Sequence, residues 1–149
     1  MLALVLVLSL TACFGTPNNG TSTTDQAKKL DVNAYKKDFE GLQKYIADNN
    51  SNPAKSELYY ELLGADNGVR FIFNNNPYVE VYDFSKADND TAKAILADIK
   101  DDGKFQPLPD GTEMTAVITA SGKYVIAWDA TRSYNYTDKV ATDEVKANW

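Results

Sequence analysis

The side chains that most often carry out catalysis are sparse in this 149-residue sequence. It contains no histidine and one cysteine, so it lacks the commonest general base and the imidazole of the usual catalytic triads. Carboxylates are the remaining acid–base groups. Glu57 and Glu61 are one helical turn apart, and such a pair works as acid and base only in a cleft that separates their pKa values. The other interpretation of this pair is a solvated helix face.

Acidic residues are densest between positions 88 and 102. A calcium loop needs oxygen ligands at alternating positions and a glycine at its bend, but Ala92 and Lys93 stand where ligands would continue. Helix capping by residues 88–90 is the expected role, and Ca²⁺ binding is the alternative that the sequence leaves open. No glycine-rich phosphate loop is present, and we predict neither a metal site nor a cofactor.

The single cysteine ends an apolar run. Residues 2–10 read LALVLVLSL, which is too short to span a bilayer but suits the apolar core of a secretory signal. Leu10, Thr11, Ala12 and Cys13 follow the order of the lipobox, so the segment resembles that of bacterial lipoproteins. The resemblance implies cleavage before Cys13, a diacylglyceryl group on its thiol and anchorage in the membrane. The family has Lys or Arg before the apolar run where this sequence has only Met1, so we expect the true start upstream.

The segment after the cysteine differs in composition from the rest. Residues 13–30 are rich in Thr, Asn, Gly and Ser without apolar periodicity, which is typical of a flexible tether. We therefore expect a signal peptide over residues 1–12, a tether over residues 13–30 and one domain over residues 31–149. The sequence has no basic patch of the kind that nucleic-acid binding needs, and a domain with a net charge of −6 would be repelled by phosphates.

Three helices and two hairpins are predicted from apolar spacing. Asn33 is a candidate cap for the first helix, which would turn Tyr35, Phe39, Leu42 and Ile46 inward and stop at residues 49–50. A second helix is predicted from Pro53 to Gly64, with Leu58, Tyr59 and Leu62 inward. A third is predicted after a cap at residues 88–90, with Gly103 beyond its end. A short last helix, capped by Thr137, would bury Val140 and Val145.

The strands alternate with a period of two. Residues 69–73 and 78–84 make the first expected hairpin, and residues 114–119 and 123–128 make the second around a Ser121–Gly122 turn. The order α-α-β-β-α-β-β predicts an α+β fold. We expect a four-stranded, mostly antiparallel sheet with the helices packed on one face. This layout resembles small uncharacterised lipoproteins of Gram-positive bacteria, which carry a compact α+β domain after a tether.

Aromatic side chains mark the candidate binding surface. Phe71, Phe73, Val79 and Val81 share one strand face and suit a core. The candidate ligand-binding residues are Tyr78, Tyr82, Tyr124 and Trp128. If their strand faces align on a sheet face without helices, they form a ring-lined platform; otherwise they belong to the core.

These features favour a non-catalytic, lipid-anchored binding or interaction module outside the bacterial cell membrane. Its partners would be the membrane, through Cys13, and an envelope protein, peptide or glycan. One alternative is an envelope hydrolase that uses carboxylates. Another is a small inhibitory or structural partner of an envelope protein.

Overall fold

The computed structural model describes residues 30–74, 76–108, 111–133 and 139–149. The predicted signal peptide, Cys13, the tether up to residue 29 and the Thr137 cap lie outside the described residues. The strands are β1 (Ala54–Glu57), β2 (Asn67–Ile72), β3 (Tyr78–Asp83), β4 (Lys104–Phe105), β5 (Met114–Ile118) and β6 (Tyr124–Trp128). The helices are η1 (Val32–Ala34), α1 (Phe39–Asn49), η2 (Tyr60–Leu63), α2 (Asp90–Asp102) and α4 (Asp143–Asn148), of which η1 and η2 are 3₁₀ turns.

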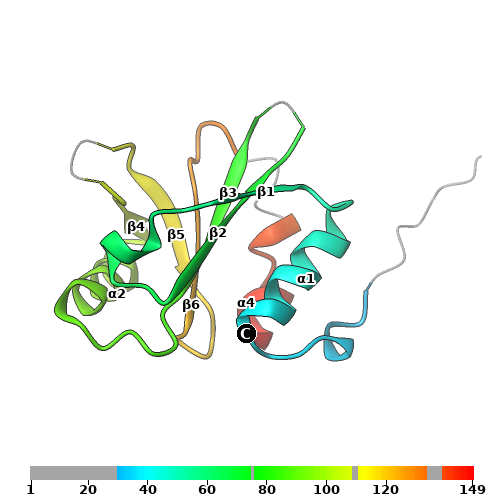
Figure 1. Cartoon of the computed structure of the whole chain (residues 1–149), viewed down its shortest axis with the longest axis horizontal. Coiled ribbons are helices and arrows are strands. Elements are labelled where there is room, and N and C mark those ends of the chain that lie inside the picture. Colours follow the sequence, from blue (N-terminus) through cyan, green and yellow to red (C-terminus); the bar gives the residue numbers. More distant parts are fainter. Residues whose placement is uncertain (1–29, 75, 109–110, 134–138) are drawn as a thin grey trace, which may run out of the picture.

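The strands form one antiparallel sheet in the order β1-β2-β3-β6-β5-β4 (Figure 1). The α+β class and the two hairpins, β2–β3 and β5–β6, are confirmed. The expected number of four strands is wrong because two short strands, β1 and β4, extend the sheet at its edges. Strand β4 has two residues and β1 is largely solvent-exposed, so neither has the apolar alternation that identifies a half-buried strand.

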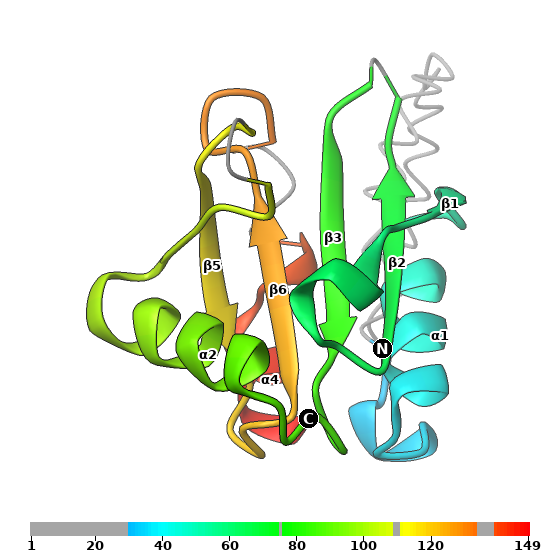
Figure 2. The ribbon, with the colours of Figure 1, turned by 60° about the vertical axis from the view of Figure 1, so that its left-hand side comes forward.

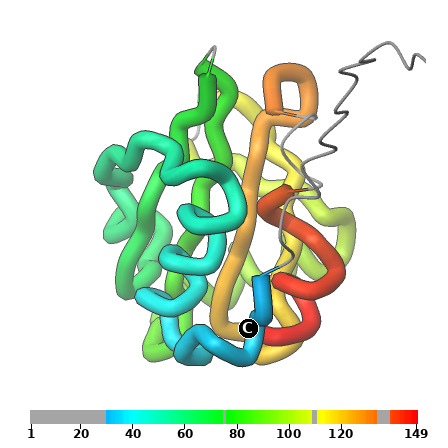
Figure 3. The backbone as a smooth tube through the Cα atoms, turned by 90° about the vertical axis from the view of Figure 1, so that its right-hand side faces the viewer, coloured from blue at the N-terminus to red at the C-terminus, as the bar shows by residue number. Residues whose placement is uncertain are grey.

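Helices cover both faces of the sheet, which corrects the expectation of a single covered face. Helices α1 and α4 lie side by side over one face (Figure 3), and α2 lies across the other, in front of β5 and β6 (Figure 2). The cause is the composition of the two central strands. In β6, Ile126 packs with α1 and α4, while Val125 and Ala127 pack on the α2 side. A strand that is apolar on both faces needs cover on both faces.

The first helix starts later than predicted. Residues 32–34 form η1, the chain is extended at Tyr35, and Asp38 caps α1 by accepting a hydrogen bond from the Gly41 N–H at 2.8 Å. The core positions of this helix are confirmed: Phe39, Leu42 and Ile46 are buried. Its predicted end is also confirmed, since Asn49 is its last residue.

The predicted second helix is wrong. Residues 54–57 pair with β2 as β1, in a register that sets Ala54 opposite Ile72, and only residues 60–63 make a helical turn, η2. Leu63 is buried there, whereas Tyr59 is 83% and Leu62 62% exposed. The backbone hydrogen bonds of the β1–β2 ladder outweigh the weak helical spacing of three apolar residues. Gly64 does end this segment, with a φ of 67°.

The third helix confirms its predicted limits. Asn89 caps α2 by accepting from the Ala92 N–H at 2.9 Å, and Gly103 ends it at a φ of 69°. Ala92 and Ile99 are buried against the sheet. The last helix also buries Val145 as expected, but it begins after a Thr142 cap. No helix in the described part of the chain is long and apolar enough to cross a bilayer.

Gly41 lies where the start of α1 contacts the carboxyl end of the described domain. A Cβ at this position would lie 2.0 Å from the Lys36 carbonyl oxygen. The same oxygen accepts a hydrogen bond from the buried indole of Trp149 at 3.2 Å. The absence of a side chain at residue 41 therefore allows the Lys36 carbonyl to hold Trp149 beside α1.

We predict that Gly41→Ala lowers the free energy of unfolding by about 1–3 kcal/mol, the usual effect of overpacking. The Cβ displaces the Lys36 carbonyl, and this outweighs the gain of up to about 1 kcal/mol in helix propensity. Urea denaturation measures the effect. Glu40→Ala, at the exposed neighbouring position, is the control and stays within about 0.5 kcal/mol of the parent. A Gly41→Ala protein as stable as the parent contradicts this account.

Candidate functional site

The four aromatic residues predicted as a binding surface divide between the two faces of the sheet. Residues directly opposite each other on paired strands share a face. Tyr124 is opposite Asp83 and Trp128 is opposite Val79, so both point toward α1 and α4. Tyr78 and Tyr82 point to the α2 side.

Burial also argues against the predicted platform. Tyr82 and Tyr124 are only 2% and 4% exposed. The central strands β3 and β6 carry core side chains on both faces, and the rings of Tyr82 and Tyr124 are among these core side chains. The four residues therefore do not share one face of the sheet, and Tyr82 and Tyr124 belong to the core, which is the alternative that the sequence left open.

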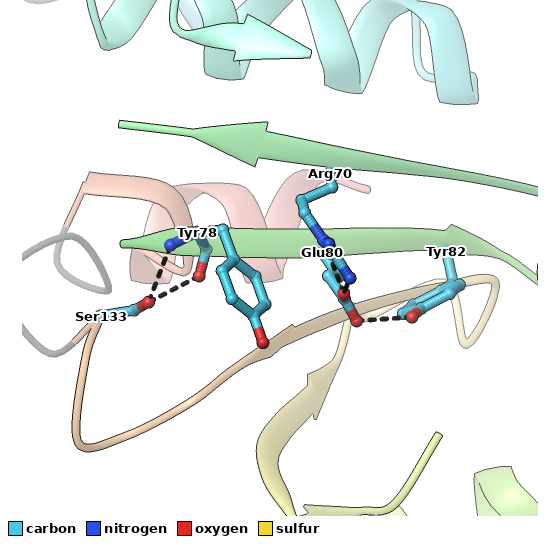
Figure 4. Close-up of polar contacts among 5 residues, drawn as sticks. All are labelled: Arg70, Tyr78, Glu80, Tyr82 and Ser133. Carbon is cyan, nitrogen blue, oxygen red and sulfur yellow. Dashed lines mark hydrogen bonds and ion pairs between the residues drawn. The ribbon is translucent and has the colours of Figure 1, made fainter. Parts of the chain in front are cut away.

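Tyr82 instead belongs to a polar cluster on β2 and β3 (Figure 4). Arg70 and Glu80 are directly opposite each other on these strands, and the Arg70 Nη2 and Nε atoms donate to Glu80 Oε1 at 2.6 and 2.9 Å. The Tyr82 hydroxyl donates to Glu80 Oε2 at 2.6 Å. Both oxygens of the Glu80 carboxylate, which is 2% exposed, therefore accept hydrogen bonds from the protein.

Tyr78 supports the same cluster from the start of β3. Its ring centroid lies 4.5 Å from the Arg70 guanidinium carbon, within the range of a cation–π contact. Its backbone is held by the buried Ser133 hydroxyl, which accepts from the Tyr78 N–H at 3.1 Å and donates to the Tyr78 carbonyl at 2.6 Å (Figure 4). Ser133 thus continues the hydrogen bonding of β3 beyond the end of β6.

The hydrogen bonds of this cluster stabilise the Arg70–Glu80 ion pair and are not arranged for proton transfer to a reacting atom. Burial, together with the charge of Glu80 and the hydrogen bond to it, raises the pKa of Tyr82 far above its usual value of 10.0. The phenol therefore stays protonated and keeps donating to Glu80. A general acid or base must lose and regain a proton at a reacting atom, whereas each of these groups is directed at another. The geometry supports a role in fixing the β2–β3 register.

The other carboxylates take different positions from those predicted. Glu57 ends β1 and Glu61 lies in η2, so they are not one turn apart on a helix. In the acidic segment, Asn89 caps α2, and its Nδ2 donates to the Gly64 carbonyl at 2.9 Å. No group of three or more metal-ligating side chains is found among the described residues.

The largest exposed apolar side chains of the described domain lie in a segment that sequence reasoning placed in the core. Tyr59 and Leu62 flank Tyr60, which packs toward the α2-side core. A Cβ on Gly68 would lie 2.9 Å from the Tyr60 Cβ. Tyr60 therefore packs directly against the backbone of β2, where Gly68 has no side chain. Gly68 is the sequence signal that was missed, since a strand glycine indicates a close approach.

A groove of about 490 Å³ runs along this segment. It is lined by Glu57, Leu58, Tyr59, Tyr60, Glu61, Asn67 and Gly68. The structure thus brings Glu57 and Glu61 to one groove after all, at its rim and exposed to solvent. The groove is the strongest candidate for a contact surface on the α2 side of the sheet.

The chain matches no family model, no curated protein and no solved structure.

We predict that Tyr82→Phe lowers the free energy of unfolding by about 1.5–3 kcal/mol, because it removes a buried hydrogen bond to a charged group. Tyr78→Phe is the matched control: it keeps the ring beside Arg70 and changes stability by less than about 0.5 kcal/mol. Denaturant titrations of the three proteins at neutral pH measure both effects. Equal stability of Tyr82→Phe and its parent contradicts the role assigned to this hydroxyl.

The difference in unfolding free energy between the parent and Tyr82→Phe also depends on pH. The folded-state pKa of Tyr82 is raised, so its contribution is fully present below the unfolded pKa of 10.0 and declines above it, where the unfolded chain ionises. The difference between parent and Tyr82→Phe therefore narrows as the pH rises above about 10. A constant difference across this range contradicts the assignment.

Proposed function

We propose that this protein is a lipid-anchored, non-catalytic binding module on the outer side of a bacterial cell membrane. The observation that carries the proposal is the exposure of Tyr59, the N-cap residue of η2, and of Leu62 within η2. They are the two most exposed large apolar side chains of the described residues, ahead of Leu108, and they lie three residues apart. Clustered exposed apolar groups mark contact sites, and tyrosine is among the residues that contribute most to interfaces.

The chemistry of the surrounding groove indicates the kind of partner. Glu57 and Glu61 are exposed, and both line the groove together with Tyr59. A protein segment with apolar side chains flanked by Lys or Arg is complementary to such a surface. We therefore favour an envelope protein as the partner, over a free peptide or a glycan. An inhibitory or structural role is one way in which such binding would act.

The position of the predicted lipid anchor is compatible with partner binding at η2. Leu30, the first described residue, packs with the core on the α1 and α4 side. The η2 segment packs with the core on the other side of the sheet. The tether predicted between Cys13 and Leu30 has about 17 residues and a mean reach of roughly 20–25 Å. The domain can therefore direct η2 away from the membrane.

A second candidate function is hydrolysis by carboxylates, favoured by one observation: Glu57 and Glu61 line the same groove as Tyr59 and Tyr60. Both glutamates are exposed, whereas acid–base pairs work in environments that separate their pKa values. The binding function is therefore the stronger candidate. Glu57→Gln and Glu61→Gln separate the two, since a hydrolase loses turnover while a binding module shows weaker, less salt-dependent binding.

Membrane anchorage is tested with Cys13→Ser. We expect the parent chain in the membrane fraction and the variant in the soluble fraction, because loss of the thiol removes the acceptor of two fatty chains, each contributing about 0.8 kcal/mol per buried CH₂. Ser22→Ala, within the predicted tether, is the control and stays with the membrane. Mass spectrometry of the native protein decides the chemistry, since an unmodified Cys13 with residues 1–12 still attached contradicts lipidation.

Partner binding is tested by substituting Tyr59 with a photo-crosslinking phenylalanine analogue in intact cells. We expect crosslinks to one envelope protein and a loss of affinity of roughly tenfold or more in a Tyr59→Ser, Leu62→Ser double variant, as for residues central to an interface. Leu108→Ser is the matched control, because Leu108 is an exposed leucine between β4 and β5, outside the η2 segment. Binding that survives the double variant contradicts the assigned surface.

A further inference from the structure

A separate cavity of about 430 Å³ lies where the end of α1 meets the start of β1 and the end of β2. These segments come together near the β2–β3 hairpin in Figure 1. The described lining is rich in side-chain amides, from Asn49, Asn50, Asn52 and Asn74, and also includes Ser51, Pro53, Ala54, Ile72, Phe73 and Lys139. Its volume falls in the range of roughly 300–1,000 Å³ that is usual for small-molecule sites.

The backbone at the rim is held in an unfavourable conformation. Ser51 and Asn52 are consecutive residues with φ angles of 59° and 52°, a region that side chains other than asparagine rarely adopt. The Asn52 N–H donates to the Ala47 carbonyl at 2.8 Å, which closes the turn after α1. Elsewhere among the described residues, Gly64, Gly103 and Gly122 have positive φ, and so does Asn76 in the turn between β2 and β3, with a φ of 68°.

The choice of residues at this rim is informative. Glycine adopts positive φ without strain and asparagine tolerates it, so Ser51 is the residue of this turn that departs from the usual preference. Ser51 and Asn52 place a hydroxyl and an amide beside the cavity. Strained backbone of this kind tends to gather at functional sites.

The amides are partly fixed by hydrogen bonds. Asn50 Nδ2 donates to the Ile46 carbonyl at 2.8 Å, and Asn49 Nδ2 donates to the Lys139 carbonyl at 3.3 Å. These contacts tie the end of α1 to residue 139 and set the shape of the wall. Asn52 is exposed at the rim, where its side chain offers two N–H donors and one oxygen acceptor.

We propose that this cavity binds a neutral saccharide. Each sugar hydroxyl is both donor and acceptor, and a primary amide offers both functions on adjacent atoms. The half-buried Pro53 and Ile72 supply apolar contacts for the C–H faces of a sugar ring. The described lining contains no carboxylate, so it lacks the group that would select a cation. The inference does not depend on the protein-binding groove, which lies at the other end of β1.

The test is a titration of the full-length protein in detergent with chitotetraose, cellotetraose and maltotetraose, followed by NMR of the asparagine side-chain amides. At least one tetrasaccharide is expected to shift the signals of Asn49 and Asn52 with a millimolar or tighter dissociation constant. Asn52→Gly is the key variant, because glycine accepts the φ of residue 52 and removes only the amide. It should weaken binding roughly three- to tenfold, as the loss of one or two hydrogen bonds predicts.

Two controls make the outcome decisive. Asn33→Ala removes an exposed amide near the opposite end of α1 and should leave the affinity unchanged. The Tyr59→Ser, Leu62→Ser variant should bind the saccharide like the parent, so failure of the proposed groove leaves this site standing. The inference is overturned if no tetrasaccharide shifts the amide signals, if Asn52→Gly binds as tightly as the parent, or if the signals respond only to a peptide.

Discussion

The fold depends on the pairing of β3 with β6, two strands whose side chains are buried on both faces. Val81 opposite Ile126 packs toward α1 and α4, and Tyr82 opposite Val125 packs toward α2. Both strands carry core side chains on each face, so each face of the sheet must be covered by helices to exclude water. The two covering layers come from different parts of the chain: α1 and α4 from its two ends, and η2 and α2 from its middle.

A buried carboxylate at the centre of such a sheet has a specific consequence. Glu80 lies between Arg70 on β2 and Ala127 on β6. A slip of one residue in β3 would turn Glu80 into the apolar core beneath α1, without Arg70 or the Tyr82 hydroxyl. Buried ion pairs often add little net stability. We therefore assign the Arg70–Glu80–Tyr82 cluster to the register of the sheet.

The parts of the fold that were predictable from the sequence are those where a local signal agrees with tertiary packing. The two hairpins alternate clearly, and α2 has a cap at Asn89 and a terminating Gly103. The start of α1 was misplaced because Asn33 and Asp38 are both acceptable caps, and the contact between Gly41 and the Lys36 carbonyl selects the second. Strand β1 was missed because an exposed edge strand needs no apolar alternation.

Whether the aromatic residues form one surface could not be decided from the sequence for a related reason. Alternation shows which strand residues share a face, but the face on which each hairpin turns its rings follows from the β3–β6 register. That register joins strands more than forty residues apart. This register places Tyr78 and Tyr82 on one face of the sheet and Tyr124 and Trp128 on the other. The amide-lined cavity was also invisible, because it needs α1, β1 and β2 to meet.

Residues 51–62 combine two departures from ordinary folding preferences. Ser51 and Asn52 hold positive φ, and a few residues later Tyr59 and Leu62 project into water. The sheet does not require either feature, since β1 contributes only an exposed edge and Leu63 and Tyr60 suffice to attach η2 to the core. Sequences that otherwise agree with their fold tend to break local rules where they function. This agrees with the two proposals for the connection between α1 and β2, a saccharide cavity at its beginning and a protein-binding groove at its end.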